Sequence, residues 1–193
     1  MSKPDAAFDT PLILDPDTGW FRGCRHCPSP NFDARPGGTL VDLLVVHAIS
    51  LPAGSFGGPS IEQLFLNRLD HSRDESFRQL VGLRVSAHFL IRRNGELVQF
   101  VSTRERAWHA GVSRFENRER CNDFSLGVEL EGCDDQPFTS VQYDVLLRLA
   151  SVLRQSHPAI TPARIVGHAD IAPGRKTDPG PHFDWGRVRA ALA

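Results

Sequence analysis

The segment GHADIAPGRKTDPGP, residues 167–181, constrains the fold more than any other part of the chain. It contains Pro173, Pro179 and Pro181. Proline lacks a backbone donor and clashes with the preceding helical turn, so no helix can run through these positions. We therefore expect a rigid loop, and loops held on a scaffold are where functional side chains are commonly placed.

This segment also carries His168 and Asp178. A neutral imidazole and a carboxylate together suit Zn²⁺. The best candidate for a third ligand is His47, which ends the apolar run LLVVH. We expect His47 and His168 at the carboxyl ends of two strands, side by side on one sheet. Three protein ligands with a fourth position left for water are typical of a catalytic zinc site. The sequence thus predicts one Zn²⁺ per chain and a water whose pKa falls from 15.7 to about 7.

Two further side chains are candidates for the chemistry. Glu129 and Glu131 alternate along SLGVELEG, so they share one face of a strand. We take Glu129 as the general base because it lies deeper between apolar neighbours; an edge strand with a solvated acidic face is the alternative. Lys176 would stabilise an oxyanion, and losing such a donor costs about 2.7–4 kcal/mol. The alternative for Lys176 is an ordinary exposed loop lysine.

Other histidines and cysteines give weaker signals. His88 lies within SAHFLI, where a buried, hydrogen-bonded structural histidine is favoured over a metal ligand. His109 in AWHAG could line the cleft. Cys24 and Cys27 form a CxxC pair, for which free thiols are favoured over a zinc knuckle or redox pair because no second ligand pair stands at matched spacing.

The order of predicted elements indicates the fold class. A chain of 193 residues can form one domain that buries about 70% of its unfolded surface. Residues 1 to about 40 read as irregular. Strands are expected at 42–49, in an Asn94-Gly95 hairpin over 85–101, at 107–111, at 125–132 and at 164–168. Helices are expected at 60–69 behind an N-cap at Ser60, at 139–157, and at 183–193 with Asp184 near the cap. Hairpin strands followed by helices favour an α/β or α+β domain with a mixed sheet.

Charge and hydropathy exclude several classes. The formal net charge is −1, from 22 basic and 23 acidic residues, which argues against a nucleic-acid partner and against strong attraction to anionic lipid. No apolar run approaches the ~18 residues of a membrane span. The first residues show no signal-peptide pattern, so we expect a cytoplasmic protein.

Five motifs in order carry a family resemblance: LLVVH, the SAH stretch with its NG hairpin, AWHAG, NDFSLGVELEG and GHADIAPGRKTDPGP. Together they resemble the zinc-dependent N-acetylmuramoyl-L-alanine amidases of the phage-lysozyme and peptidoglycan-recognition type, and most closely the AmpD-type 1,6-anhydro-muropeptide amidases. The resemblance runs from about Pro28 to Trp185. It divides the chain into an N-terminal arm, 1–27, and a zinc amidase domain, 28–193.

The resemblance implies a mixed central sheet flanked by helices, and a specific reaction. The enzyme would cleave the amide between the lactyl group of 1,6-anhydro-N-acetylmuramic acid and the L-alanine of the stem peptide. It would act in cytoplasmic peptidoglycan recycling and lower the signal that induces β-lactamase. The zinc ligands would be His47, His168 and Asp178, and Glu129 and Lys176 would be the catalytic pair.

The resemblance also implies contacts with a small muropeptide from Arg84, Arg120 and Ala172. Arginine fits here because stem peptides carry carboxylates, which guanidinium groups bind bidentately; ordinary surface arginines are the alternative. The chain departs from the AmpD pattern at Ala48, where that pattern has Asn after the first zinc histidine.

Other functions stay open at this stage. The same chemistry could act on intact cell-wall peptidoglycan, which would require export. A non-catalytic muropeptide-binding module would tolerate loss of Asp178, Lys176 or Glu129, and all three are present. A general zinc peptidase lacks support because the chain has no HExxH motif.

Overall fold

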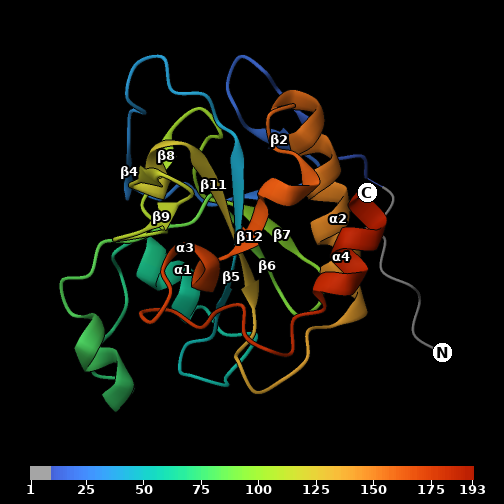
Figure 1. Cartoon of the computed structure of the whole chain (residues 1–193). Helices are drawn as coiled ribbons and strands as arrows, with labels where there is room; N and C mark the ends of the chain where they lie inside the picture. The colour runs from blue at the N-terminus through green and yellow to red at the C-terminus, as the bar shows by residue number, and fades with distance from the viewer. Residues whose placement is uncertain (1–9) are drawn as a thin grey trace.

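A six-stranded mixed β-sheet forms the centre of the computed structural model, which describes residues 10–193 (Figure 1). The strand order is β12-β5-β11-β6-β7-β3. The first four strands run parallel to their neighbours, β7 is antiparallel to β6, and β3 is parallel to β7. The strands are β3 (Arg25–His26), β5 (Leu43–Ile49), β6 (Phe89–Ile91), β7 (Leu97–Gln99), β11 (Ser125–Glu131) and β12 (Ile165–Gly167). The predicted mixed sheet in a single α/β domain is confirmed.

The long strand β5 occupies an interior position, with β12 on one side and β11 on the other. Leu43, Leu44, Val45 and Val46 have no exposed surface. A parallel strand covered on both faces needs apolar residues at every position, which explains the unbroken run LLVV. The strand predicted for 42–49 is confirmed.

One face of the sheet packs against α2 (Ser140–Ser156) and α4 (Trp185–Leu192) (Figure 1). The even-numbered residues of β11, such as Val128, belong to this core together with Leu146 and Leu149 of α2. Thr139 caps α2 in a capping box with Gln142, and the Asp184 carboxylate accepts the Arg187 N–H at 2.9 Å to cap α4. Both helices were predicted from the sequence.

The opposite face carries shorter elements: α1 (Ser60–Phe65), the 3₁₀ turn η3 (Cys121–Asp123) and α3 (His168–Ile171). Two separate apolar clusters cover it, one around Phe65 and Leu90, the other around Val45 and Phe124. The odd-numbered side chains of β5 and β11 face this side. It is therefore the side on which polar groups such as His47 are buried.

The β6–β7 hairpin has a three-residue loop. The Gly95 N–H donates to the Arg92 carbonyl at 2.9 Å, and the Arg92 N–H donates to the Glu96 carbonyl at 2.9 Å. Gly95 adopts φ +87°, a conformation that side chains disfavour. The predicted hairpin is confirmed, with Gly95 in the bulge position that follows a type I turn.

Three local expectations were wrong. Ser60 does not cap α1: the N-cap is Pro59, without a side-chain hydrogen bond, and the helix ends at Phe65 instead of 69. The strand expected at 107–111 is the two-residue β8 (Arg106–Ala107). His168 does not end a strand but opens α3, because one helical turn fits before Pro173.

The N-terminal region is more regular than predicted. It contains β1 (Ile13–Leu14), β2 (Phe21–Arg22) and β4 (Phe32–Asp33), and β3 extends the edge of the main sheet. A strand of two residues shows no periodicity in the sequence, so pairing with other strands defines it: β1 pairs with β2, β3 with β7 and β4 with β8. The first nine residues of the arm predicted at 1–27 lie outside the described residues, and the boundary at 27 stays a prediction.

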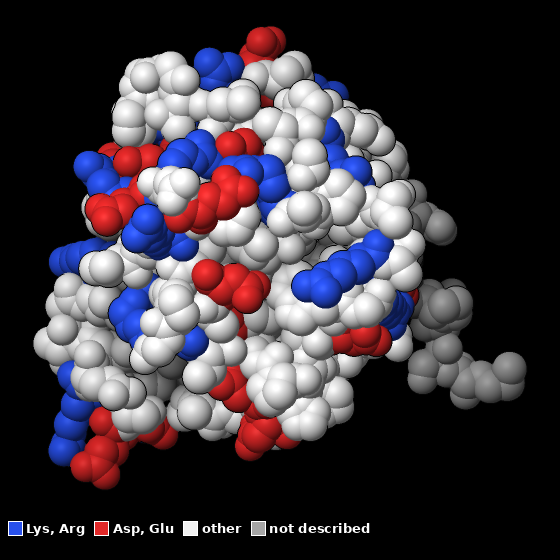
Figure 2. All heavy atoms as spheres, in the orientation of Figure 1, with Lys and Arg blue, Asp and Glu red and all other residues white. Residues whose placement is uncertain are grey.

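The remaining short elements lie around the rim of the fold. The strand β4 pairs with β8, and β9 pairs with β10. These elements are β9 (Arg114–Phe115), β10 (Arg118–Glu119), η2 (Glu75–Leu80) and η4 (Pro162–Arg164). Basic and acidic side chains are interspersed on the face shown in Figure 2. Within residues 10–193, no helix is both long and apolar enough to cross a membrane.

An arginine–glutamate cluster ties four elements together: Arg25, Glu62, Arg92, Glu96 and Glu131. Arg25 contacts Glu62 and Glu96, each at 2.7 Å, and Arg92 contacts Glu62 and, at 3.2 Å, Glu131. Hydrogen bonds from Arg25, and then from Arg92, lower the pKa of Glu62 to about 2. The cluster therefore joins β3, α1 and the hairpin to β11.

We expect Glu62→Gln to destabilise the fold by about 1–2 kcal/mol at pH 7, a value reduced for solvent screening. Because the pKa of Glu62 is depressed from 4.5 to about 2, its contribution is complete above pH 4.5 and is lost as the pH falls towards 2. Urea unfolding of both proteins at pH 7 and pH 3 measures this. Glu75→Gln, at a highly exposed glutamate, is the matched control. A wild-type-to-variant difference that stays constant with pH contradicts the prediction.

Candidate active site

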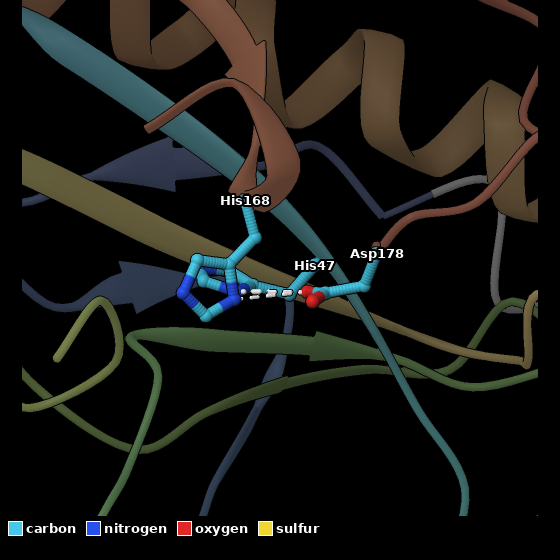
Figure 3. Close-up of side chains that lie close together, drawn as sticks. All are labelled: His47, His168 and Asp178. Atoms are coloured by element: carbon cyan, nitrogen blue, oxygen red, sulfur yellow. Dashed lines mark hydrogen bonds and ion pairs between the residues drawn. The ribbon is translucent and has the colours of Figure 1, made fainter. Parts of the chain in front are cut away.

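Three donor atoms meet in a triangle on the polar side of the sheet (Figure 3). His47 Nδ1 lies 3.0 Å from His168 Nδ1. Asp178 Oδ2 lies 3.1 Å from His168 Nδ1 and 3.3 Å from His47 Nδ1. These residues form a group that could hold a metal ion. The structure thus brings together the three residues that the sequence analysis selected.

The fold explains why these distant residues meet. Because β12 lies parallel to β5, with Gly167 opposite Val46, His168 emerges beside His47. The chain then turns through α3 and its proline-rich loop. The Ala169 N–H donates to the Asp178 carbonyl at 2.9 Å, which returns Asp178 to the first turn of α3.

The electrostatics of the triangle favour a cation. His168 Nε2 donates to the Ala110 carbonyl at 3.2 Å, which leaves Nδ1 with its lone pair. Burial lowers the pKa of His47 to about 4, so it stays neutral at pH 7. Burial alone would raise the pKa of Asp178, but its contacts with His168 and His47 hold that pKa well below the usual range. Two imidazole nitrogens and an ionised carboxylate therefore converge, an arrangement that suits a bound cation.

The size of the triangle indicates which cations fit. Tetrahedral ligands at Zn–N distances of ~2.0–2.1 Å stand roughly 3.3 Å apart. The observed sides of 3.0–3.3 Å agree with this spacing. Ca²⁺ takes six to eight oxygen ligands at about 2.3–2.6 Å, which two imidazoles do not supply.

Glu129 lies next to the triangle, opposite His47 in the register of β11 and β5. Its Oε2 is buried and has no hydrogen-bond partner within residues 10–193. Burial, and then the charge of Asp178, raise its pKa well above 4.5, while Lys176 acts in the opposite direction. An unpaired buried carboxylate oxygen is costly. Its presence beside the donor triangle fits a site built around a cation and a polar ligand.

The other acidic residue on this face is already engaged. Glu131 Oε1 accepts the Gly57 N–H at 2.7 Å, and Oε2 accepts the Arg93 N–H at 3.1 Å. It is bound further by Arg92. β11 is an interior strand and both carboxylates are buried, so the alternative of a solvated edge strand is excluded. Glu129 remains available for proton transfer, and Glu131 does not.

A pocket of about 440 Å³ opens over these groups. Lys176 and Arg84 line it, together with apolar side chains that include Phe65, Leu83 and Trp108. Lys176 is exposed, and its ammonium has no hydrogen-bond or ion-pair partner in the described part of the chain. Its charge lowers the pKa of Glu129, so it lies within electrostatic reach of the site.

A second pocket, of about 500 Å³, adjoins the first and shares Gly111 and Arg175 with it. Arg120 and Ala172 line this second pocket, not the first. Arg120 adopts φ +60°, and its Nε lies 3.4 Å from Asp123. The three residues predicted to contact substrate are therefore divided between the pockets: Arg84 lines the pocket over the donor triangle, and Arg120 and Ala172 line the adjoining one.

The remaining histidines differ in role. His88 Nδ1 accepts the Gly127 N–H at 3.0 Å and its Nε2 lies 3.1 Å from the Glu105 carbonyl, which confirms a buried structural histidine. His109 Nδ1 lies 2.9 Å from His47 Nε2, on the side of that imidazole facing away from the triangle. The sequence analysis did not predict this contact between His109 and His47. The one available signal was Gly127, a glycine inside a strand of large residues.

Comparison with known proteins identifies the family of this chain. The N-acetylmuramoyl-L-alanine amidase family profile matches residues 37–181. The chain belongs to this family of amidases and is an enzyme of that class.

Relatives within the family are similar over most of their length. The 1,6-anhydro-N-acetylmuramyl-L-alanine amidase AmpD of Escherichia coli K12 is 51% identical over 177 residues, 92% of this chain and 96% of that protein. The Salmonella typhimurium SL1344 protein of the same name is 53% identical over 178 residues, 92% of this chain and 95% of that protein.

Solved structures show the same fold. A crystal structure of a selenomethionine AmpD derivative superposes with a TM-score of 0.90 at 51% identity, covering 94% of this chain and 99% of that one. A complex of the E. coli amidase AmiD with the substrate anhydro-N-acetylmuramic acid-L-Ala-D-γ-Glu-L-Lys gives 0.58 at 31% identity, covering 81% of this chain and 60% of that one.

Asp178→Ala should weaken metal retention, because it removes the only anionic corner of the donor triangle. We expect a loss larger than the roughly 10–100-fold caused by removing an outer-shell partner. Metal content after dialysis, measured by atomic emission, tests this. Asp170→Ala, a carboxylate in the same segment that accepts the Gly167 N–H, is the control. Unchanged metal content in Asp178→Ala means that Asp178 is not a ligand.

Proposed function

We propose that this amidase is a zinc enzyme that hydrolyses the amide between the lactyl group of 1,6-anhydro-N-acetylmuramic acid and the L-alanine of a stem peptide. The observation that carries the proposal is the His47–His168–Asp178 triangle with the unpaired Glu129 oxygen beside it. The similarity to AmpD enzymes over more than nine-tenths of the chain supports the substrate.

His47, His168 and Asp178 would hold one Zn²⁺. Two nitrogen donors and one carboxylate are a ligand set typical of catalytic zinc, with the fourth position open. Bound there, Zn²⁺ supplies Lewis acidity and lowers the pKa of water from 15.7 to about 7, so that hydroxide is available at neutral pH.

Glu129 would act as general base and then as general acid. Its free Oε2 accepts a proton from the attacking water and afterwards delivers it to the nitrogen of L-alanine as the C–N bond breaks. A base works best when its pKa lies near the working pH. Burial moves the pKa of Glu129 upward from its usual value and therefore towards that range.

Lys176 would stabilise the charge that develops on the carbonyl oxygen. Its ammonium lines the same pocket as Glu129 and is free to reorient, because no hydrogen bond holds it within the described residues. A positioned donor of this kind contributes about 2.7–4 kcal/mol to the transition state.

The two adjoining pockets suit the two parts of a muropeptide. The first has an apolar wall beside the reacting groups. The second is lined by Arg114, Arg120 and Arg175, which could pair with stem-peptide carboxylates. We assign Arg84, Arg120 and Ala172 to substrate contact on this basis. We also propose that the reaction belongs to cytoplasmic peptidoglycan recycling, and so lowers β-lactamase induction, as the resemblance to AmpD enzymes implies.

Purified protein should release the stem peptide from an anhydro-muropeptide, and an excess of a zinc chelator should abolish the release. Mass spectrometry of the products measures this, and added Zn²⁺ should restore activity. A muropeptide with a reducing sugar, run in parallel, tests preference for the anhydro form. Equal product with and without chelator excludes zinc hydrolysis.

Glu129→Ala should keep stoichiometric zinc and lose most turnover, because general acid–base catalysis contributes about 10²–10⁴-fold. Zinc content and kcat measured on the same preparation separate the two effects. Glu131→Gln is the comparison, since its carboxylate serves the arginine–glutamate cluster and not the reaction. Full activity in Glu129→Ala removes Glu129 from the mechanism.

A further inference from the structure

A chain of hydrogen bonds leads away from the donor triangle through His109. His47 Nε2 lies 2.9 Å from His109 Nδ1, and His109 Nε2 lies 3.2 Å from Ser125 Oγ. Ser125 Oγ in turn lies 2.6 Å from the Cys121 carbonyl. The chain thus runs from β5 through the 107–111 segment and β11 to η3.

The last contact fixes the direction of every other one. A carbonyl only accepts, so the Ser125 hydroxyl donates its single hydrogen to Cys121. Ser125 Oγ must then accept from His109 Nε2–H. In a neutral imidazole the other nitrogen is an acceptor, so His109 Nδ1 accepts the hydrogen of His47 Nε2. His47 Nδ1 is left with a lone pair that points at His168 and Asp178.

We propose that His109 is a positioning residue that fixes the tautomer and ring orientation of His47 for metal binding; this rests on the metal site of the proposed function. The outer partner of a ligating histidine sets which nitrogen is free. Here that partner is a second imidazole whose own tautomer is dictated by Ser125.

The surroundings of His109 are shaped to hold it. A Cβ at Gly127 would lie 2.5 Å from His109 Cγ, so the ring occupies the space that a side chain would fill. Glycine weakens the interior of a strand, and here it permits close approach of the ring. The Asn122 side-chain oxygen accepts the N–H groups of His109, at 3.1 Å, and of Ala110, at 2.8 Å.

The same two residues serve both imidazole ligands. The His109 ring receives the hydrogen of His47, and the Ala110 carbonyl receives that of His168 at 3.2 Å. Arg175 donates to the same carbonyl at 2.7 Å and holds it in place. One short segment therefore sets the free nitrogen of each ligand, which makes it more than a packing element.

The test compares metal affinity across three variants. His109→Leu keeps the bulk and removes the acceptor; His109→Asn keeps an acceptor oxygen at the place of Nδ1; His88→Asn alters the neighbouring structural histidine, which contacts no ligand. Competition with a chromophoric chelator gives the Kd for Zn²⁺. We expect His109→Leu to weaken binding about 10–100-fold, and His109→Asn and His88→Asn to stay near wild type.

A second readout is independent of metal. Nitrogen NMR of the zinc-free protein reports the tautomer of His47, which should be Nε2–H in the wild type and in His109→Asn and should become mixed in His109→Leu. If His109→Leu does not fold, Gly127→Ala gives the same test, because its methyl group displaces the ring.

The outcomes separate this inference from the proposed function. Wild-type protein that binds no zinc overturns the proposed function. Wild-type binding with equal affinity in His109→Leu, or an unchanged His47 tautomer in that variant, overturns the positioning role alone. Equal weakening in His88→Asn and His109→Leu also overturns it, because the effect would then be general destabilisation.

Discussion

The convergence of two imidazole lone pairs and a carboxylate within about 3 Å is the constraint on which the rest of this structure depends. These groups repel one another unless a positive charge lies between them. Backbone hydrogen bonds elsewhere in the fold hold them in place. The parallel pairing of β12 with β5 aligns the histidines. The backbone hydrogen bond from the Ala169 N–H to the Asp178 carbonyl positions the Asp178 carboxylate beside them. The stability of the sheet thus offsets the unfavourable free energy of this side-chain arrangement.

One face of β11 concentrates most of the supporting roles. Ser125 accepts from His109, and Gly127 makes room for that ring. Glu129 borders the triangle, and Glu131 holds the hairpin through Arg92 and accepts the Gly57 N–H. These four alternate residues sit on the polar side, while Leu126, Val128 and Leu130 fill the core beneath α2. Because successive side chains of a strand point to opposite faces, this one interior strand places its polar residues at the site and its apolar residues in the core.

Much of the fold could be predicted from the sequence, in the segments where local interactions determine the secondary structure. The apolar run before His47, the capped helix at 139–157 and the hairpin around Gly95 follow from burial, capping and turn geometry, and each was predicted. His168 and Asp178 could be selected because they lie in a proline-rich segment that cannot be helical throughout, and His47 because it follows a buried apolar run. The short strand β3 could not be predicted, because its pairing with β7 and not its own propensity defines it. The end of α1 at Phe65 was also missed, since the apolar spacing continued to residue 69.

The role of His109 also lay beyond sequence reasoning. That role depends on which atom donates in each hydrogen bond of His109. The folded chain sets this direction through Ser125 and the Cys121 carbonyl. The same holds for the division between the two pockets: Arg84 and Arg120 are equivalent as residue types, and only the path of the chain assigns them to different places.

The order of the three donors along the chain has a consequence for biosynthesis. His47 precedes His168 by 121 positions, and Asp178 comes ten positions later still. A growing polypeptide on the ribosome therefore cannot assemble the triangle until nearly all of it has been translated. Before that point the nascent chain contains only His47 of the three donors. An ion captured by the completed triangle therefore marks a molecule whose carboxyl-terminal third has docked.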